Sequence, residues 1–264
     1  MDCKKIRENM LKEAKRLASD KRINLAIIQV GEDAASDIYV RNKIKTCTEV
    51  GINTQVHKLV NYSYEGVSRL ISKMNSNPNI HGIILQLPLA DDLKGYEQKL
   101  LDLIKWNKDV DGLSSENIKR LWTDQECITP ATPTGLLNLL PEDLSGKTVT
   151  VVNRSNLIGK PLIKMLLNRN ATVTIAHSKT NFDEHAISSD YCIVAVGQMY
   201  EFDTINHFCD FWIDCGINKD TEGVIRGDVL NGETDVYCTP VPGGVGILTT
   251  AQVALNTIKC YSLQ

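Results

Sequence analysis

Short runs of apolar residues recur along the chain and alternate with stretches in which apolar residues return every three or four positions. The runs have the length of β-strands, and the intervening stretches have the period of amphipathic helices. Strands that are apolar on both faces and separated by helices are typical of a parallel sheet covered on both sides. We therefore expect an α/β fold, with strands at residues 25–30, 82–87, 148–152, 171–176, 191–196 and 211–214.

A connector between two α/β units is expected near residues 130–146. Thr132 and Pro133 are predicted to be the N-cap and the first turn of a helix, whose apolar face would consist of leucines. Pro141 is expected to close that helix, and residues 145–147 then introduce a new strand. There is no internal repeat or low-complexity segment, so the two units are expected to differ.

Composition narrows the class of protein. The 264 residues are 42% hydrophobic and 23% charged, which is typical of a soluble globular protein, and a net charge of −3 gives no basic surface for nucleic acid. Eight cysteines are scattered without a Cys-x-x-Cys pair, so we expect reduced thiols and neither a disulfide framework nor a metal site. The N-terminus is charged and no segment approaches the length of a membrane span, so we expect a cytoplasmic protein without a membrane partner.

The first candidate for chemistry is a pair of side chains between the first two strands. Ser36 is expected to be the N-cap, and Gly51 the stop, of a helix whose core stripe is Val40, Ile44 and Cys47. Tyr39 and Lys43, at i and i+4, lie at the rim of that stripe. Partial desolvation of a lysine there would lower its pKa toward use as a proton carrier. The alternative is an ordinary lysine that extends to solvent beside a half-buried tyrosine.

Two further polar features follow the strand at 82–87. Gln86 lies at its end, and sites in α/β proteins form at the carboxyl ends of parallel strands. The alternative is a glutamine that only caps the last amide of the strand. The turn at 108–112 holds two carboxylates, Asp109 and Asp111. The alternative to a functional role is that one of them only forms hydrogen bonds within its own turn.

The second unit opens with the layout of a dinucleotide-binding βαβ unit: a strand at 148–152, a polar turn with glycine at 153–161, and then a helix. The usual glycine fingerprint is absent. After the next strand, where an NAD enzyme presents an acid to the ribose, the sequence has no acid. Arg154, Ser155 and Ser178 could instead hold a 2′-phosphate, which favours NADP over NAD. The alternative for Arg154 is an ordinary surface arginine.

A loop rich in proline and glycine, residues 239–246, precedes a last helix expected from about Thr249. Glycines permit close approach of the backbone to a ligand, but such a loop can equally serve as a hinge.

Taken together and in this order, these motifs resemble the methylenetetrahydrofolate dehydrogenase/cyclohydrolase family over nearly the whole chain. The motifs are Ser36-x-x-Tyr39-x-x-x-Lys43, Gln86-Leu87-Pro88-Leu89, Lys108-Asp109-Val110-Asp111-Gly112, Thr132-Pro133-x-Gly135, Arg154-Ser155-x-x-Ile158-Gly159-x-Pro161, His177-Ser178-x-Thr180, Asp214-Cys215-Gly216-Ile217-Asn218, Gly227-Asp228-Val229 and the loop Pro240 to Gly246.

The resemblance implies an N-terminal folate-binding catalytic domain at 1–135, completed by a C-terminal helix at 247–264. It also implies a Rossmann NADP-binding domain at 136–246, with a cleft between the two domains. The implied enzyme oxidises 5,10-methylenetetrahydrofolate to the 5,10-methenyl form with NADP. It then hydrolyses that cation to 10-formyltetrahydrofolate, a one-carbon unit for purine biosynthesis. A homodimer is also implied.

The resemblance further implies the roles of individual residues. Lys43 would be the catalytic lysine, assisted by Gln86, while Tyr39 stacks on the folate and Asp111 rather than Asp109 holds the pterin. Further substrate contacts would come from Leu87, Pro88, Pro242, Gly243 and Gly244. The cofactor would contact Thr132, Asn153, Arg154, Ser155, Ile158, Gly159, Ser178, Ile217 and Thr249. No residue is expected to bind a metal.

Asn153 departs from the family pattern, because a glycine usually precedes Arg-Ser. Asparagine tolerates left-handed backbone geometry better than most residues, so we expect a turn that accepts it but meets the cofactor differently. A monofunctional enzyme or a silent folate-binding subunit therefore stays an alternative. A short-chain dehydrogenase, which also uses Tyr-x-x-x-Lys, is disfavoured because here that pair precedes the dinucleotide unit.

Overall fold

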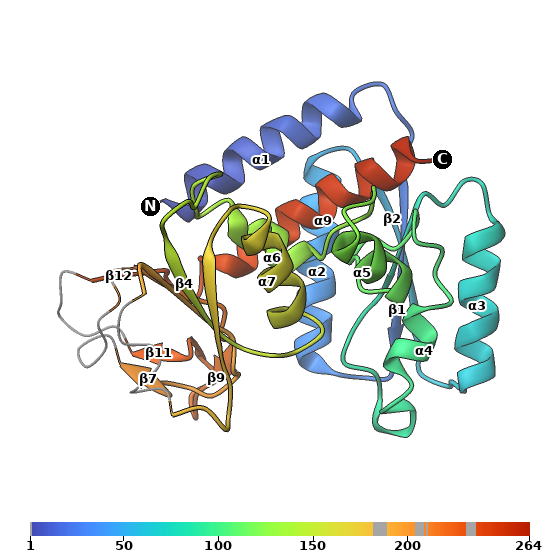
Figure 1. Ribbon diagram of the computed structural model, residues 1–264. Coiled ribbons are helices and arrows are strands. Elements are labelled where there is room, and N and C mark those ends of the chain that lie inside the picture. The colour runs from blue at the N-terminus through green and yellow to red at the C-terminus, as the bar shows by residue number, and fades with distance from the viewer. Residues whose placement is uncertain (1, 182–188, 204–208, 210, 231–235) are drawn as a thin grey trace. The chain divides into compact units, whose positions relative to one another are not determined.

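The computed structural model describes residues 2–181, 189–203, 209, 211–230 and 236–264 (Figure 1). The chain divides into two compact units. Unit 1 consists of Met1–Arg7 and Thr132–Thr249, and unit 2 consists of Glu8–Ala131 and Thr250–Gln264. Each unit has its own parallel sheet and is described separately below.

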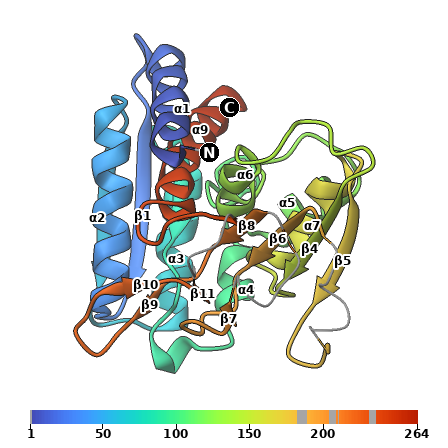
Figure 2. The same ribbon diagram turned by 90° about the vertical axis from the view of Figure 1, so that its left-hand side faces the viewer.

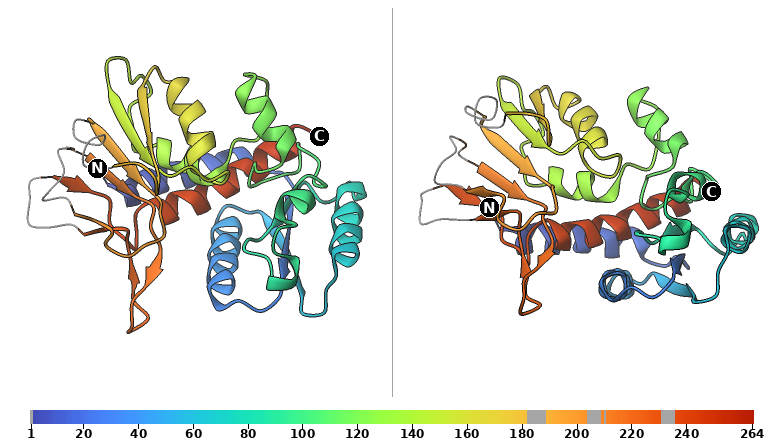
Figure 3. Two further views of the ribbon diagram at one scale, coloured as in Figure 1. Left: turned by 60° about the horizontal axis from the view of Figure 1, so that its bottom comes forward. Right: turned by 90° about the horizontal axis from the view of Figure 1, so that it is seen from below.

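The sheet of unit 2 has three parallel strands, β1 (Asn24–Val30), β2 (Asn53–Leu59) and β3 (Gly82–Leu85), in the order β2-β1-β3. Helix α2 (Ala34–Glu49) connects β1 to β2, and α3 (Tyr64–Ser76) leads from β2 back past β1 to β3. The two crossovers run in opposite directions, and right-handed crossovers then lie on opposite faces of the sheet. Figure 3 shows the strands between α2 and α3.

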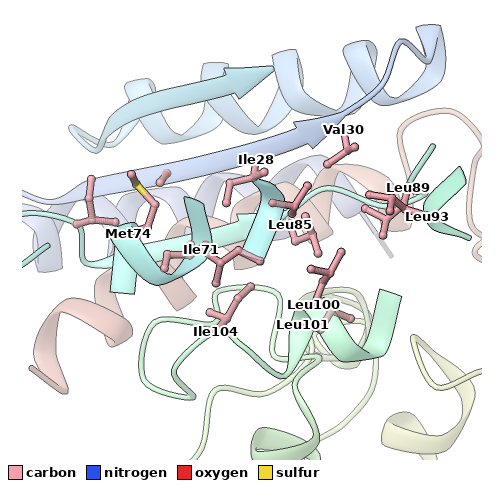
Figure 4. Close-up of a cluster of buried hydrophobic side chains, with 14 residues drawn as sticks. Ile28, Val30, Ile71, Met74, Leu85, Leu89, Leu93, Leu100, Leu101 and Ile104 are labelled. Carbon is pink, nitrogen blue, oxygen red and sulfur yellow. The ribbon is translucent and has the colours of Figure 1, made fainter. Parts of the chain in front are cut away.

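Alternate residues of β1 and β3 form the core of unit 2 on the α3 side of the sheet (Figure 4). Ile28 and Leu85 pack there with Ile71 of α3 and with Leu100 of α4 (Glu97–Leu101). The other face meets α9 (Val245–Ser262), because a Cβ on Gly82 would approach Thr257 of that helix. Both faces of the sheet are therefore buried, which explains the continuous apolar runs in the sequence.

The sheet of unit 2 continues beyond β3 for a single bridge. Asp109 bridges to Ile83, with Ile83 N donating to Lys108 O at 2.7 Å and Val110 N donating to Ile83 O at 3.2 Å. The bridge is parallel, so Asp111 emerges at the same edge of the sheet as Gln86. The remaining elements of this region are α1 (Cys3–Ala18), the 3₁₀ turn η1 (Asp91–Leu93) and α5 (Ser115–Trp122).

Unit 1 contains a five-stranded sheet in the order β12-β8-β6-β4-β5, and every pair is parallel (Figure 2). The strands are β4 (Thr148–Val152), β5 (Thr172–Ala176), β6 (Tyr191–Val194), β8 (Phe211–Asp214) and β12 (Tyr237–Cys238). Trp212, fully buried, packs with Val152, Val194 and Val229 in the core.

Helix α7 (Gly159–Leu167) joins β4 to β5, and α6 (Ala131–Leu137) precedes the sheet. Two short pairings complete the described part of this unit. They are β7 (Phe202–Asp203) with β11 (Val229–Leu230) and β9 (Asn218–Lys219) with β10 (Ile225–Arg226).

The predicted α/β class with parallel sheets is confirmed, and each predicted strand is present with ends within two residues of those expected. Four helix ends are wrong. Asp33, not Ser36, caps α2, because its carboxylate accepts from Ser36 N at 2.7 Å. Thr132 lies inside α6, which ends at Leu137 before Pro141, and α9 begins at Val245, so Gly246 falls in its first turn. The predicted domain boundaries remain a prediction.

All eight cysteines are free, and each is buried or half-buried. Burial raises the pKa of the Cys47 thiol in unit 2, and of the Cys238 thiol in unit 1, to about 12. These thiols behave as small apolar side chains of the two cores. Among the described residues, no helix combines the length and apolar character needed to cross a membrane.

Candidate active site

Lys43 and Asp111, 68 residues apart in the sequence, form an ion pair within unit 2. Lys43 Nζ lies 3.2 Å from Asp111 Oδ2 and 3.4 Å from Oδ1, and the two side chains are only 10% and 16% exposed. The lysine therefore does not extend into bulk solvent as an ordinary surface residue would. A buried charge is tolerated where a partner and hydrogen bonds compensate its lost hydration, and Asp111 provides both.

Asp109 has a different task from Asp111. Its buried carboxylate accepts hydrogen bonds from Gly112 N at 3.1 Å, Ser114 N at 2.8 Å and Asn117 Nδ2 at 3.0 Å, while burial raises the pKa of Asp109. Gly112 has a φ of +68°, and a Cβ there would lie 2.7 Å from a backbone carbonyl oxygen, so only glycine fits. Asp109 thus shapes the turn that presents Asp111.

Helix α9 fixes the ends of the same turn. Asn256 Nδ2 donates to Val110 O and to Thr129 O, each at 2.9 Å, and Ala131 N donates to Asp111 O at 3.3 Å. A C-terminal helix therefore supports a carboxylate more than a hundred residues earlier in the chain.

Gln86 directly follows β3, and its side chain is buried. Gln86 Nε2 donates to Leu87 O at 2.6 Å, whereas its Oε1 has no hydrogen-bond partner among the described residues. A carbonyl oxygen can only accept, so this contact fixes the amide orientation and leaves the oxygen free. A buried acceptor without a partner is costly and points to a ligand or a moving cation. Leu87 is half-buried beside it, and Pro88 is exposed.

Tyr39 lies one turn before Lys43 on α2 and is half-buried. Burial raises the pKa of Tyr39, so the phenol stays neutral and its ring offers an apolar face. Hydrogen bonds thus join Lys43 to Asp111. Tyr39 lies one helical turn from Lys43 on α2, and Gln86 lies at the carboxyl end of β3.

The carboxyl ends of four strands of unit 1 are level with one another. Ala176 pairs with Val152, Val152 with Val194, and Val194 with Asp214. The chain passes from β4 through α7 to β5 on one side, whereas β6 lies on the other side of β4. This reversal is a topological switch point, where α/β sheets bind their ligands.

Two exposed polar residues leave neighbouring strands at that edge. Arg154 follows β4 and Ser178 follows β5, and the sequence after β5 contains no acid before Asn181. A cation and a hydroxyl group at this place fit a 2′-phosphate better than a ribose hydroxyl.

Asn153 organises the turn after β4. Its Oδ1 accepts from Ser155 N at 2.8 Å, Ser155 Oγ at 2.7 Å and Gly159 N at 2.9 Å, and its Nδ2 donates to Ala195 O after β6. The expectation that asparagine is tolerated for left-handed geometry is wrong, because Asn153 is not among the described residues with positive φ. Its side chain instead accepts hydrogen bonds from backbone amides of the turn, so these amides need no acceptor from outside it.

Other residues that are predicted to contact the cofactor also belong to unit 1. Thr249 Oγ1 donates to Thr132 Oγ1 at 3.3 Å, Ile158 N donates to Ser155 Oγ at 3.1 Å, and Ile217 after β8 is 46% exposed.

Of the predicted substrate residues in the last loop, Pro242 is exposed and Gly243 has a φ of +102°. Gly244 is buried where a Cβ would collide with Pro240 O, so it is needed for packing.

Sequence reasoning missed two buried carboxylates at the cofactor edge, Asp214 and Asp228. For Asp214 the signal was available, because an aspartate that ends an apolar strand must find hydrogen bonds if it is buried. Among the described residues, no group of His, Cys, Asp and Glu side chains could hold a metal ion.

Comparison with protein families places both units. The model described as "Tetrahydrofolate dehydrogenase/cyclohydrolase, catalytic domain" matches residues 1–111, and the one described as "Tetrahydrofolate dehydrogenase/cyclohydrolase, NAD(P)-binding domain" matches residues 130–264. This chain belongs to the tetrahydrofolate dehydrogenase/cyclohydrolase family.

Individual members of the family resemble the chain over nearly its full length. The "Bifunctional protein FolD" of Moorella thermoacetica is 42% identical, and the match covers 96% of this chain and 94% of that protein. The crystal structure of the FolD bifunctional dehydrogenase/cyclohydrolase of Campylobacter jejuni has a TM-score of 0.88 at 35% identity, covering 99% and 96%. The Trypanosoma brucei FolD structure, complexed with NADP cofactor and inhibitor, has a TM-score of 0.86 at 28% identity, covering 99% and 95%.

Membership of the tetrahydrofolate dehydrogenase/cyclohydrolase family confirms the predicted family, the two-domain fold and the class of enzyme. It also rejects the short-chain dehydrogenase alternative. Lys43, Gln86 and Tyr39 lie in the region matched by the catalytic-domain model, and Asp111 is the last residue of that match.

Proposed function

We propose that this chain oxidises 5,10-methylenetetrahydrofolate to 5,10-methenyltetrahydrofolate with NADP, and then hydrolyses the methenyl form to 10-formyltetrahydrofolate. The observation that carries the proposal is the buried Lys43–Asp111 pair beside β3, whose next residue, Gln86, has an unpaired acceptor. A silent folate-binding subunit would need neither a buried lysine nor an open acceptor at this edge.

Hydrolysis is assigned to Lys43 and Gln86. Water adds to the carbon that bridges N5 and N10 of the methenyl cation, and the addition releases a proton. The Lys43 amine takes this proton and returns it to N5 as the bond between N5 and the bridging carbon breaks. The hydroxyl group left on that carbon loses its proton to solvent as it becomes the carbonyl of the formyl group on N10, so the overall reaction releases one proton. Gln86 Oε1 accepts a hydrogen bond from the protonated amine and so orients it.

Substrate recognition is assigned to Asp111 and Tyr39. A carboxylate offers about four acceptor positions, so Asp111 can face Lys43 and still accept the paired N–H donors of a pterin. The ring of Tyr39 supplies a flat apolar surface for stacking on the folate. Leu87, Pro88, Pro242, Gly243 and Gly244 are proposed to provide the remaining contacts with the substrate.

NADP rather than NAD is proposed as the cofactor, and when bound it supplies the hydride acceptor for the first step. The residues present fit it: Arg154 and Ser178 leave adjacent strands at the switch point, and Ser155 adds a hydroxyl group. They are assigned to the 2′-phosphate. Thr132, Asn153, Ile158, Gly159, Ile217 and Thr249 are assigned to the rest of the binding surface.

A cytoplasmic homodimer that supplies 10-formyltetrahydrofolate to purine biosynthesis completes the proposal. Eight free thiols suit a reducing compartment. In the described part of unit 1, β5 pairs on one side only, and Ile175 on this edge strand is 43% exposed, as suits a surface for a second copy. Size-exclusion chromatography with light scattering checks the dimer, and a monomer at micromolar concentration would contradict it.

The test of the function is a spectrophotometric assay of the purified chain with methylenetetrahydrofolate and either NADP or NAD. We expect methenyltetrahydrofolate to form faster with NADP and then to decay to the 10-formyl form. Decay of supplied methenyltetrahydrofolate without any formation would reduce the function to cyclohydrolase alone. Faster oxidation with NAD would overturn the assignment of Arg154.

A further inference from the structure

Asp228 is fully buried, and its carboxylate lies among backbone amides. Asp228 Oδ2 accepts from Val196 N at 2.6 Å and Gly197 N at 3.0 Å, and its Oδ1 accepts from Gln198 N at 3.0 Å. Three consecutive amides of the loop after β6 therefore converge on one side chain. Such a run of N–H groups is an anion-binding concavity, here filled by the protein itself.

No lysine or arginine among the described residues forms an ion pair with Asp228. Within the described part of the chain its side-chain donor is neutral: Asn218 Nδ2 lies 2.8 Å from Oδ1. A buried carboxylate without a counter-ion is costly unless hydrogen bonds compensate it, and here four N–H donors do so. The arrangement fixes the loop after β6 through one residue.

Asp228 also holds the loop after β8. Asn218 ends that loop, and Gly216 begins it by donating to Asp214 Oδ1 at 2.7 Å. Asp214 in turn accepts from Asp228 N at 3.1 Å and Val229 N at 2.9 Å, so the two aspartates are linked. A Cβ on Gly216 would collide with the Asp228 carboxylate, which leaves no freedom in this contact.

Ile217 lies between the two anchored residues of that loop. Gly216 is tied to Asp214 and Asn218 to Asp228, yet the Ile217 side chain is 46% exposed. An apolar side chain presented to solvent from a rigid backbone suits a flat ligand better than a core.

The position of both loops relates them to the cofactor. Ala195, the first residue after β6, accepts from Asn153 Nδ2 at the end of β4, so the loop held by Asp228 adjoins the switch point. From β5 to β8 the edge then presents Ser178, Arg154, residues 195–198 and Ile217 in order.

We propose that Asp228, supported by Asp214, is a positioning residue that holds the loops 196–198 and 216–218 in the shape that receives NADP. This inference rests on the proposed function, since it concerns the cofactor assigned there. Asp228 is fully buried and bonded to both loops, so it acts on binding through them. A preformed surface avoids the ordering cost that a flexible loop would incur on binding.

The test is the dissociation constant of NADP for the full chain, measured by isothermal titration in wild type and in Asp228→Asn. Asparagine keeps the volume but replaces one oxygen by an NH₂ group that must face a backbone N–H. Each carboxylate oxygen accepts two N–H groups, so asparagine loses one or two buried hydrogen bonds, and we expect NADP to bind at least about tenfold more weakly. Hydrolysis of supplied methenyltetrahydrofolate, assigned to unit 2, should stay within about twofold of wild type, as uncoupled sites do.

A matched variant separates positioning from loss of stability. Val149→Ala removes buried methyl groups near the start of β4, at the opposite end of the strand from these loops, and lowers Tm. It should leave the dissociation constant of NADP unchanged. If Asp228→Asn does not fold, Asn218→Ala provides the second probe, because it removes the side-chain donor that ties the loop after β8 to Asp228, and it should also weaken NADP binding.

Two results would overturn the inference while leaving the proposed function intact. One is wild-type NADP affinity in folded Asp228→Asn or Asn218→Ala, and the other is an equal loss of affinity in Val149→Ala. A wild-type chain that binds no NADP would overturn the cofactor assignment itself, and the positioning role with it.

Discussion

The carboxyl edges of the two parallel sheets are prepared for their ligands in different ways. In unit 2 the edge presents charged side chains, the Lys43–Asp111 pair, and the free acceptor of Gln86. In unit 1 the edge presents loops whose amides are already bonded to Asn153 and Asp228. The first edge retains an unused acceptor, whereas in the second the loop amides are already bonded and hold its shape, and the exposed Arg154 and Ser178 remain for the ligand.

This difference follows from what each edge has to do. A group that moves a proton must be able to change partners, so it cannot be fully satisfied before the substrate arrives. A surface that receives a cofactor needs a fixed form, because the cofactor brings its own chemistry. Substitutions in the first edge should therefore remove a reaction, and substitutions in the second should weaken binding by degrees.

The sharpest test of this contrast is Lys43→Met. Loss of a proton carrier should slow hydrolysis of methenyltetrahydrofolate by about 10²–10⁴-fold while the circular dichroism spectrum stays that of wild type. The decay of the methenyl absorbance, corrected for the uncatalysed rate, measures the effect. Lys45→Met on the same helix, an exposed position, is the control and should be as active as wild type. Hydrolysis at the wild-type rate in Lys43→Met would remove the assigned role.

The two aspartates of the 108–112 turn should separate activity from stability. Asp111→Asn is expected to lower kcat/KM for methylenetetrahydrofolate by about 10–100-fold, because charge-assisted hydrogen bonds are lost. Asp109→Asn should instead lower the free energy of unfolding by about 1–3 kcal/mol, because one of its three buried donors loses its acceptor. Steady-state kinetics and urea unfolding of both variants measure the two effects. Loss of activity in Asp109→Asn with loss of stability in Asp111→Asn would contradict the roles given to the two aspartates.

In the second edge, Arg154→Ala should weaken NADP binding by about 10–100-fold and leave NAD binding nearly unchanged, because only the 2′-phosphate contact is lost. Titration calorimetry with both coenzymes measures the difference. Lys160→Ala, an exposed position in the first turn of α7, is the control for charge alone. An equal loss for both coenzymes would show that Arg154 does not read the 2′-phosphate.

The smallest effect is expected at the amino ends of the unit 1 strands, away from the cofactor edge. The hydrogen bond from Lys147, helped by Thr148 N, lowers the pKa of Asp190 to about 2. The folded-state pKa is therefore below the ordinary value of 3.8, so this stabilisation is complete above about pH 4 and disappears as the pH falls through about 2.

Asp190→Asn should therefore destabilise the protein by about 1 kcal/mol at pH 7, a figure reduced because the side chain is partly exposed, and by almost nothing near pH 2. Unfolding by urea at the two pH values measures it. NADP affinity should not change. A loss of affinity would mean that the amino ends of the strands also influence the binding edge.

Much of this arrangement was predictable from the sequence because it depends on local patterns. The apolar runs predicted the parallel strands, and the motif order predicted the family. The i, i+4 spacing predicted that Tyr39 and Lys43 would lie one turn apart on α2. The pairing of Lys43 with Asp111 was harder to predict, because periodicity does not say which of Asp109 and Asp111 faces Lys43.

The features that escaped prediction depend on tertiary hydrogen bonds. Asp33 rather than Ser36 caps α2, although both residue types are good caps. Asn153 resembled a strained substitute for glycine, and only the acceptors and donors around it show that it holds the turn together. Asp228 accepts hydrogen bonds from amides 30 to 32 residues earlier in the chain, and the sequence motif around it does not show which amides those are.

Six of the eight cysteines are buried, and these thiols can report on opening of the two units. A thiol reacts as the thiolate, and a thiol whose pKa is about 12 is almost entirely protonated at neutral pH. Alkylation of Cys47 should therefore record opening of unit 2, and alkylation of Cys192, 1% exposed, opening of unit 1. Pulse labelling followed by peptide mass spectrometry measures both alkylation rates in the wild-type protein. The same measurement with NADP bound shows whether the cofactor slows alkylation of Cys192 without slowing that of Cys47.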